Sequence, residues 1–137
     1  MSNFTKYRSG LNNVGSYQLS SQPYLTSSLT IPASSGEPLE VSFDNVSSFV
    51  VISNTIPGNV TNIPLRFGFS ANGVKGLEDN NYAILNNGES FEAKFRVTKL
   101  YLLSDNTSPC SGSVVAGLTG IDINELPLNW SGSLGVG

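Results

Sequence analysis

Short runs of alternating apolar and polar residues, separated by turn-forming residues, constrain this chain more than any other feature. LEVSFDN and IPLRFGFS each repeat an apolar residue at every second position. This period is typical of β-strands in a sheet with one buried face. The residues expected to face inward are Leu39, Val41, Phe43, Leu65, Phe67 and Phe69, and those expected outward include Glu40, Ser42, Asp44, Arg66, Gly68 and Ser70.

Two further stretches refine this expectation. SFVVISN is apolar on both faces from Phe49 to Ile52, which favours a central strand or one covered by a neighbour. NYAILNNGESFEAKFRV joins two alternating runs through Asn87-Gly88, a pair typical of a tight hairpin turn. After that turn Phe91, Ala93, Phe95 and Val97 are expected to point to the core, and Glu92, Lys94, Arg96 and Thr98 to water.

The whole pattern predicts an all-β antiparallel β-sandwich of about eight strands, spaced roughly 8 to 12 residues apart. YLTSSLTI, TKLYLLS and SGSVVAGLTGI supply further strands, and no helical period of useful length competes. Only 12% of the 137 residues are charged, which fits a chain poor in the residues that build soluble helices. One domain is expected, over residues 23–123.

The two ends lack this alternation. Residues 1–22 form a predicted N-terminal arm, and residues 124–137 a predicted C-terminal interaction tail, both rich in glycine, serine or asparagine. Large apolar residues are scattered through both ends, although disordered tails are usually poor in them. We therefore expect these ends to become ordered against a partner, with an interface formed by Phe4, Tyr7, Tyr17, Trp130, Leu134 and Val136.

Composition excludes several function classes. The chain has no histidine, so the Ser-His-Asp and Cys-His nucleophile arrangements and imidazole metal sites are not available. A glycosidase would need only two carboxyl groups, but the ten acidic residues are scattered, and we expect no enzyme activity, no catalytic residues and no cofactor. A net charge of −3 argues against nucleic-acid binding, and no segment is apolar enough to span a membrane.

Three local features have both a functional and a structural interpretation. Asp122, Asn124 and Glu125 could contribute oxygens to a calcium site, but a solvated connection is favoured because the EF-hand spacing is missing, and no metal is expected. Tyr24, Tyr82 and Tyr101 could stack on sugars, but packing and hydrogen bonding at the sandwich surface are favoured. The single cysteine, Cys110, is expected to be an unpaired residue in a loop.

Taken over nearly its whole length, the chain resembles a known family. The arm containing GLNNVGSYQLSSQPYLTSSL, the stretches LRFGFSANGVKG and NYAILNNGESFEAKFRVTKLYL, and VVAGLTGI before the tail are similar to the small single jelly-roll capsid proteins of double-stranded DNA viruses. The resemblance implies an eight-stranded jelly roll with extended arms that closes capsid vertices as a penton or cements neighbouring capsomers. It also implies other capsid proteins as partners, a homo-oligomer such as a pentamer or trimer, and location in the virion after synthesis inside the host cell without a signal peptide.

Two other functions stay open at this point. A carbohydrate- or receptor-binding β-sandwich on a viral spike would have a concave pocket of aromatic and polar residues and would bind glycans as a monomer. An enzyme would need a pocket that holds two close carboxyl groups, one of them with a perturbed pKa.

Overall fold

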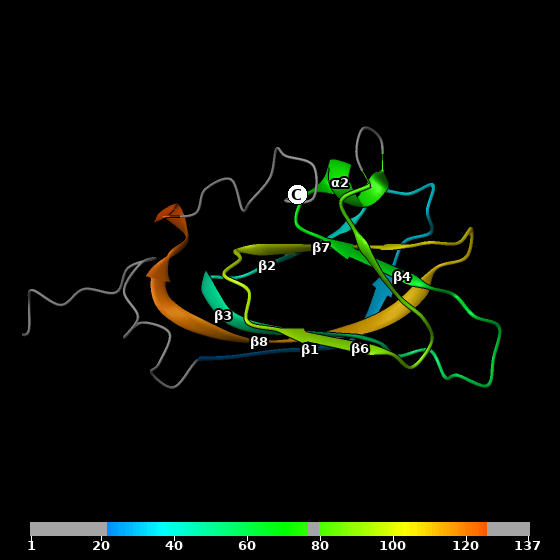
Figure 1. The fold of residues 1–137 in the computed structure, drawn as a ribbon, viewed down its shortest axis with the longest axis horizontal. Coiled ribbons are helices and arrows are strands. Elements are labelled where there is room, and N and C mark those ends of the chain that lie inside the picture. The colour runs from blue at the N-terminus through cyan, green and yellow to red at the C-terminus, as the bar shows by residue number, and fades with distance from the viewer. Residues whose placement is uncertain (1–21, 77–79, 126–137) are drawn as a thin grey trace, which may run out of the picture.

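Two antiparallel four-stranded sheets lie face to face in the computed structural model, which describes residues 22–76 and 80–125 (Figure 1). The lower sheet has the order β1-β8-β3-β6, and the upper sheet the order β2-β7-β4-β5. The predicted all-β antiparallel sandwich is therefore confirmed. The elements are β1 (Gln22–Ile31), β2 (Leu39–Ser42), β3 (Asn45–Asn54), β4 (Leu65–Gly68), α2 (Ala71–Lys75), β5 (Ala83–Leu85), β6 (Ser90–Ala93), β7 (Lys99–Ser104), β8 (Cys110–Asp122) and the 3-10 turn η2 (Ile123–Glu125).

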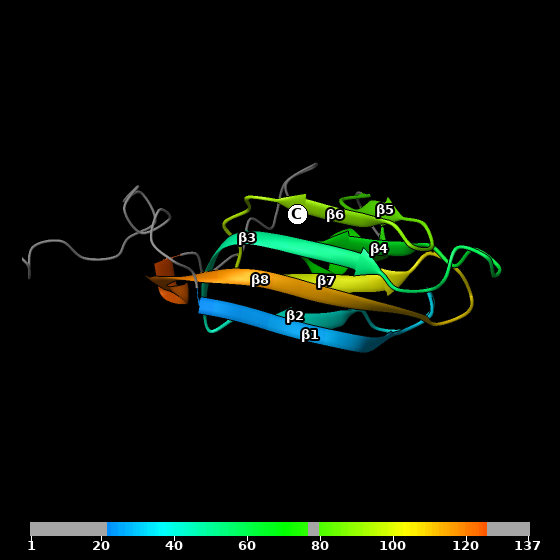
Figure 2. The same cartoon turned by 90° about the horizontal axis from the view of Figure 1, so that it is seen from below.

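Strands from the two halves of the chain pair in reverse order. β1 pairs with β8, β2 with β7, β3 with β6 and β4 with β5, all antiparallel. Two further pairs, β3 with β8 and β4 with β7, join these four ribbons into the two sheets. Figure 2 shows the lower sheet from below, with β8 and β3 as its two inner strands.

The core fills the space between the sheets. Val50 and Ile52 of β3 are fully buried there, and β3 lies between β8 and β6, which confirms its predicted central position. Phe49 and Val51, on the other face of β3, are only partly buried. The inward positions predicted in and beside β2 and β4 are confirmed. Four of these residues are buried and two, Leu39 and Phe69, are partly buried against the core. The other buried members of this core are Ile31, Val41, Phe43, Leu65, Phe67, Leu85, Val97, Leu100, Leu102, Cys110, Val114, Ala116 and Leu118.

The hairpin predicted around Asn87-Gly88 is wrong. Gly88 has the positive φ of 76° that such a turn requires, and the Glu89 N–H donates to the Asn86 carbonyl at 3.0 Å. However, β5 pairs with β4 in the upper sheet, whereas β6 pairs with β3 in the lower sheet. The turn therefore connects the two sheets, because a two-stranded ribbon buries less apolar surface than strands added to opposite sides of a core.

Two residues expected to face water are buried. Thr98 is only 5% exposed, because β6 ends at Ala93 and the strand alternation stops before Thr98 is reached. Gly68 is also buried, because α2 covers the outer side of β4. The remaining expectations for this region agree with the structure: Val97 is buried, Phe91 and Phe95 pack against the core, Ala93 is partly buried, and Glu92, Lys94 and Arg96 are exposed.

The five-residue helix α2 was not predicted. Ser70 caps its start by accepting a hydrogen bond from the Gly73 N–H at 3.0 Å, and Gly76 ends it in the left-handed conformation at φ 72°, as expected for such caps. Within the described part of the chain, no helix is long and apolar enough to cross a membrane.

Candidate functional site

The six residues predicted to form an interface cannot be placed. Phe4, Tyr7, Tyr17, Trp130, Leu134 and Val136 all lie outside the described residues, so they stay predictions. Most of the predicted N-terminal arm and C-terminal tail lies there too. The candidate site therefore comes from the surfaces of residues 22–76 and 80–125.

The three tyrosines considered as sugar platforms have separate partners. Tyr24 packs edge-on against Phe43, with ring centroids 4.9 Å apart. The Tyr82 ring lies beneath the Arg66 guanidinium, 4.4 Å from the carbon Cζ to the ring centroid. Because each ring contacts a different neighbour on a different strand or loop, surface packing describes them better than a shared sugar platform does.

Tyr101 belongs to a polar cluster on the outer face of the upper sheet. Its hydroxyl donates to Glu40 Oε1 at 2.7 Å, Ser42 donates to Glu40 Oε2 at 3.1 Å, and Lys99 Nζ lies 3.5 Å from Oε1. The hydrogen bond from Tyr101 is the main cause that lowers the pKa of Glu40. Burial, together with the nearby carboxylate, raises the pKa of Tyr101 to about 12. The carboxylate is therefore held in its charged form by β2 and β7, an arrangement that ties the two strands together.

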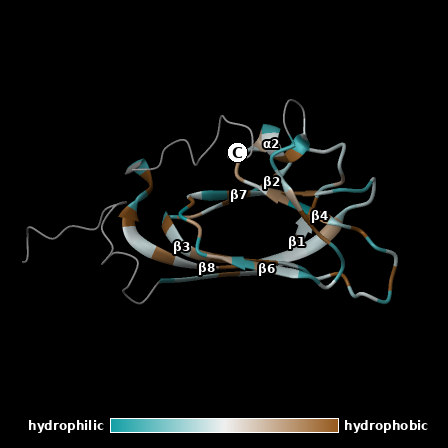
Figure 3. Cartoon of the chain, viewed as in Figure 1, coloured by the Kyte–Doolittle hydropathy of each residue, from teal (hydrophilic) through white to brown (hydrophobic). Residues whose placement is uncertain are grey.

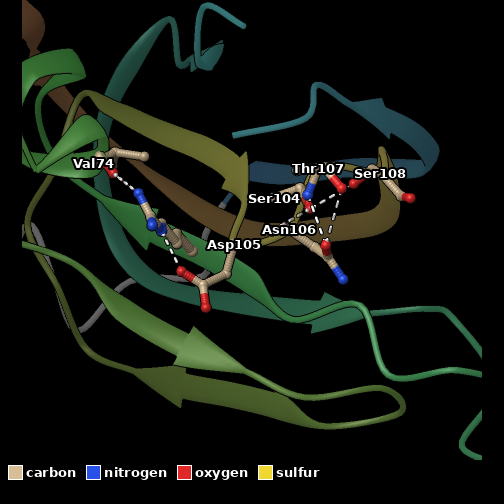
Figure 4. A network of polar contacts seen from close by, with 7 residues as sticks. Val74, Ser104, Asp105, Asn106, Thr107 and Ser108 are labelled. Atoms are coloured by element: carbon tan, nitrogen blue, oxygen red, sulfur yellow. Dashed lines mark hydrogen bonds and ion pairs between the residues drawn. The ribbon is translucent and has the colours of Figure 1, made fainter. Parts of the chain in front are cut away.

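Arg66 forms a second polar cluster beside β4. Its Nε donates to Asp105 Oδ1 at 2.6 Å, and its Nη1 donates to the Val74 carbonyl at the end of α2 at 3.1 Å. Figure 4 shows these contacts beside the loop of residues 105–109, where Ser104 Oγ donates to the Ser108 carbonyl at 2.7 Å. The guanidinium, on the outward side of β4 as expected, thus joins β4, α2 and the loop after β7.

Asn54 and Asn87 fix the loop of residues 55–64 between β3 and β4. Asn54 is 2% exposed, and its Nδ2 donates to the Ile63 and Leu85 carbonyls, both at 3.1 Å. Asn87 Nδ2 lies within hydrogen-bond distance of three carbonyls of the loop, nearest at 2.9 Å to Thr61, and its Oδ1 accepts from the Ile63 N–H at 2.9 Å. The asparagine that marked the turn in the sequence therefore organises a neighbouring loop as well.

The outer faces of the two sheets differ. On the upper sheet, α2 provides a cover, since Val74 and Leu103 are both fully buried there. Gly68 permits this close packing, because a Cβ at its position would lie 2.6 Å from Val74 Cγ2. Among residues 22–76 and 80–125, no helix lies on the outer face of the lower sheet (Figures 1 and 2).

A group of apolar residues lies on this outer face of the lower sheet, which no described element covers. Leu25 of β1 is opposite Val115 of β8, which is opposite Val51 of β3. One row away, Gly117 of β8 lies between Pro23 and Phe49. In Figure 3 the ribbons of β3 and β8 are mostly white to brown. We call Pro23, Leu25, Phe49, Val51 and Val115 the outer strip; all five are partly or fully exposed, with Leu25 at 71%.

The features that suggested a thiol or a metal site have ordinary surroundings. Cys110 begins β8 and is buried rather than lying in a loop, and burial raises the pKa of its thiol. Asp122 Oδ1 accepts from the Asn124 N–H at 2.9 Å, so this carboxylate caps η2. Among the described residues, no group of three or more acidic or cysteine side chains could hold a metal ion.

Comparisons with known proteins supply no relative for this chain. No protein-family model matches it, no curated protein matches it, and no solved structure matches it.

Proposed function

We propose that this chain is a single jelly roll that serves as a virion structural protein. It would act as a small capsid component that closes vertices as a penton or cements neighbouring capsomers through protein–protein contacts. The proposal combines the fold class, the resemblance drawn from the sequence and the surface of the lower sheet.

The order of strand pairing supports the jelly roll. A long antiparallel ribbon, folded so that its first strand meets its last, gives the pairs β1·β8, β2·β7, β3·β6 and β4·β5 that the sheets contain. Rolling this ribbon brings β8 beside β3 and β7 beside β4. Eight strands in two such sheets are the architecture of many capsid domains.

The outer strip is the observation that carries the assembly function. Single exposed apolar side chains are common on protein surfaces, but a contiguous group on one sheet face is typical of an interaction site. Here the group spans three adjacent strands, β1, β8 and β3. The apolar residues of the two chain ends, Trp130 among them, are the sequence feature that such a surface complements.

A test of the function is the mass of the purified full chain, measured by light scattering over a range of concentrations. We expect defined homo-oligomers, pentamers or trimers, and we expect them to dissociate when residues 129–137 are deleted. Circular dichroism of the deleted chain is the control for folding. A chain that stays monomeric and binds immobilised glycans would instead favour the carbohydrate- or receptor-binding module.

A further inference from the structure

We propose that the outer strip binds the C-terminal segment, residues 126–137, of a neighbouring copy of this chain. This inference rests on the proposed assembly function and names the surface that the assembly would use. The size of the strip, its charge and the path of β8 support this assignment.

The size of the strip favours a short peptide over a folded partner. A standard interface between folded proteins involves roughly 20 to 30 residues a side. The outer strip offers Pro23, Leu25, Phe49, Val51 and Val115, and a row of serines borders it, since Ser53 lies opposite both Ser113 and Ser90. A strip of this width fits an extended segment with a few apolar anchors better than it fits a second sandwich.

The charge of the strip distinguishes between the two chain ends. None of its five residues is charged, and Glu92, opposite Val51, is the acidic residue at its margin. Residues 126–137 contain no charged side chain and carry Leu128, Trp130 and Leu134, whereas residues 1–21 include Lys6 and Arg8. Burying an unpaired charge against an apolar surface is costly, so the C-terminal segment is the better match.

The path of β8 favours a neighbouring copy over the same chain. β8 passes the strip at Val115 and continues to Asp122, after which η2 follows. The chain therefore leaves this strand heading away from its own strip and would have to reverse direction to cover it. A segment of twelve residues spans at most about 40 Å when extended, which is enough to cross three strands of another copy.

The contact is expected on the face of the sheet and not along its edge. β1 is an edge strand, but its pairing with β8 shifts register between Thr26 and Leu29, and Pro23 near its start has no N–H to donate. Bulges and prolines are features that prevent an edge strand from adding another strand. The side chains of the outer strip, Leu25 above all, are therefore the binding elements.

The test is a charge placed in the strip, with a matched charge elsewhere. Leu25→Glu acts on a side chain that is 71% exposed, so the fold should survive, and Ile84→Glu, 45% exposed on β5 of the other sheet, is the control. Trp130 is the only tryptophan, and its fluorescence reports directly on burial of the segment. For the full chain we expect a blue shift that grows with protein concentration, together with rising mass in light scattering.

Leu25→Glu should raise the protein concentration at which the blue shift and the increase in mass appear by more than about tenfold. Ile84→Glu should leave this concentration unchanged. Trp130→Ala should weaken assembly by a similar factor, which tests the contact from its other side. A chain with Leu25→Glu that assembles and shifts as the unaltered chain does would overturn the assignment of the strip but leave the assembly function standing. A blue shift independent of concentration would place the segment on its own chain, and no shift with no assembly would remove both proposals.

Discussion

Replacing Asn54 by alanine should destabilise the fold far more than an ordinary surface change. The side chain is 2% exposed, its Nδ2 donates to the Ile63 and Leu85 carbonyls, and its Oδ1 accepts from the Ile56 N–H, each at 3.1 Å. A hydrogen bond contributes a net stability of about 1 kcal/mol, and more when its loss leaves a buried partner unsatisfied. Three such bonds predict a loss of about 3 kcal/mol in the free energy of unfolding.

The measurement is urea unfolding of the full chain followed by circular dichroism, with the slope of the transition checked for change. Asn59→Ala, at an exposed position of the same loop, is the control and should change stability by less than about 0.5 kcal/mol. Asn54→Asp keeps an acceptor for Ile56 but turns a carboxylate oxygen toward the two carbonyls, so at neutral pH it should cost more than alanine. A loss below about 1 kcal/mol for Asn54→Ala would refute the view that this residue fixes the loop.

Two further outcomes are expected. In the same unfolding assay, Phe67→Ala should lower the free energy of unfolding by about 3 to 5 kcal/mol, because the ring is 5% exposed and its removal leaves a cavity in the core. Phe95→Ala should lower it by less, since that ring is only partly buried. Equal losses for the two variants would contradict this difference in burial. In an NMR titration that follows the Tyr101 ring itself, this residue should ionise near its pKa of about 12, and Glu40→Gln should lower that pKa. Since the pKa of Tyr101 is raised in the folded state, the stability contributed by its hydrogen bond is present below pH 10 and is lost as the pH rises toward 12. Ionisation of the Tyr101 ring near pH 10 in the unaltered chain would argue against the hydrogen bond.

The sequence predicted the sheets well where burial alone decides the pattern. Val41 and Phe43 alternate with exposed residues, as a strand with one buried face must. Val50 and Ile52, with apolar neighbours between them, correctly indicated a central strand. These predictions held because periodicity reflects which face meets the core, whatever the partner strand is.

Which strands pair with one another could not be predicted in the same way. Asn87-Gly88 correctly predicted a tight turn. A turn alone does not determine whether β5 and β6 pair with each other or, as observed, with β4 and β3. The ion pair of Arg66 with Asp105, 39 positions away in the sequence, could not be predicted for the same reason. Both features arise from contacts between residues far apart in the sequence.

The candidate site shows a related limit. The outer strip was not predicted, because Leu25, Val51 and Val115 come from three strands and form one row only through sheet register. The signal available was the two-sided apolar character around Phe49, which was interpreted as burial within a sheet. Part of that apolar character lies instead on the outer face of the lower sheet, where Phe49 and Val51 are partly exposed.

The position of β8 has a consequence for the order in which the protein can fold during synthesis. β8 is the last of the described strands, yet it lies between β1 and β3, and the Thr26–Val114 hydrogen bond joins residues 88 positions apart. A growing chain would therefore hold β1 without β8, its only neighbour among the described strands of that sheet, until residues 110–122 had left the ribosome. Contacts of such long range are slow to form, and unpaired strands are prone to aggregate while they wait. Access to chaperones between the synthesis of β1 and that of β8 should thus raise the yield of folded protein.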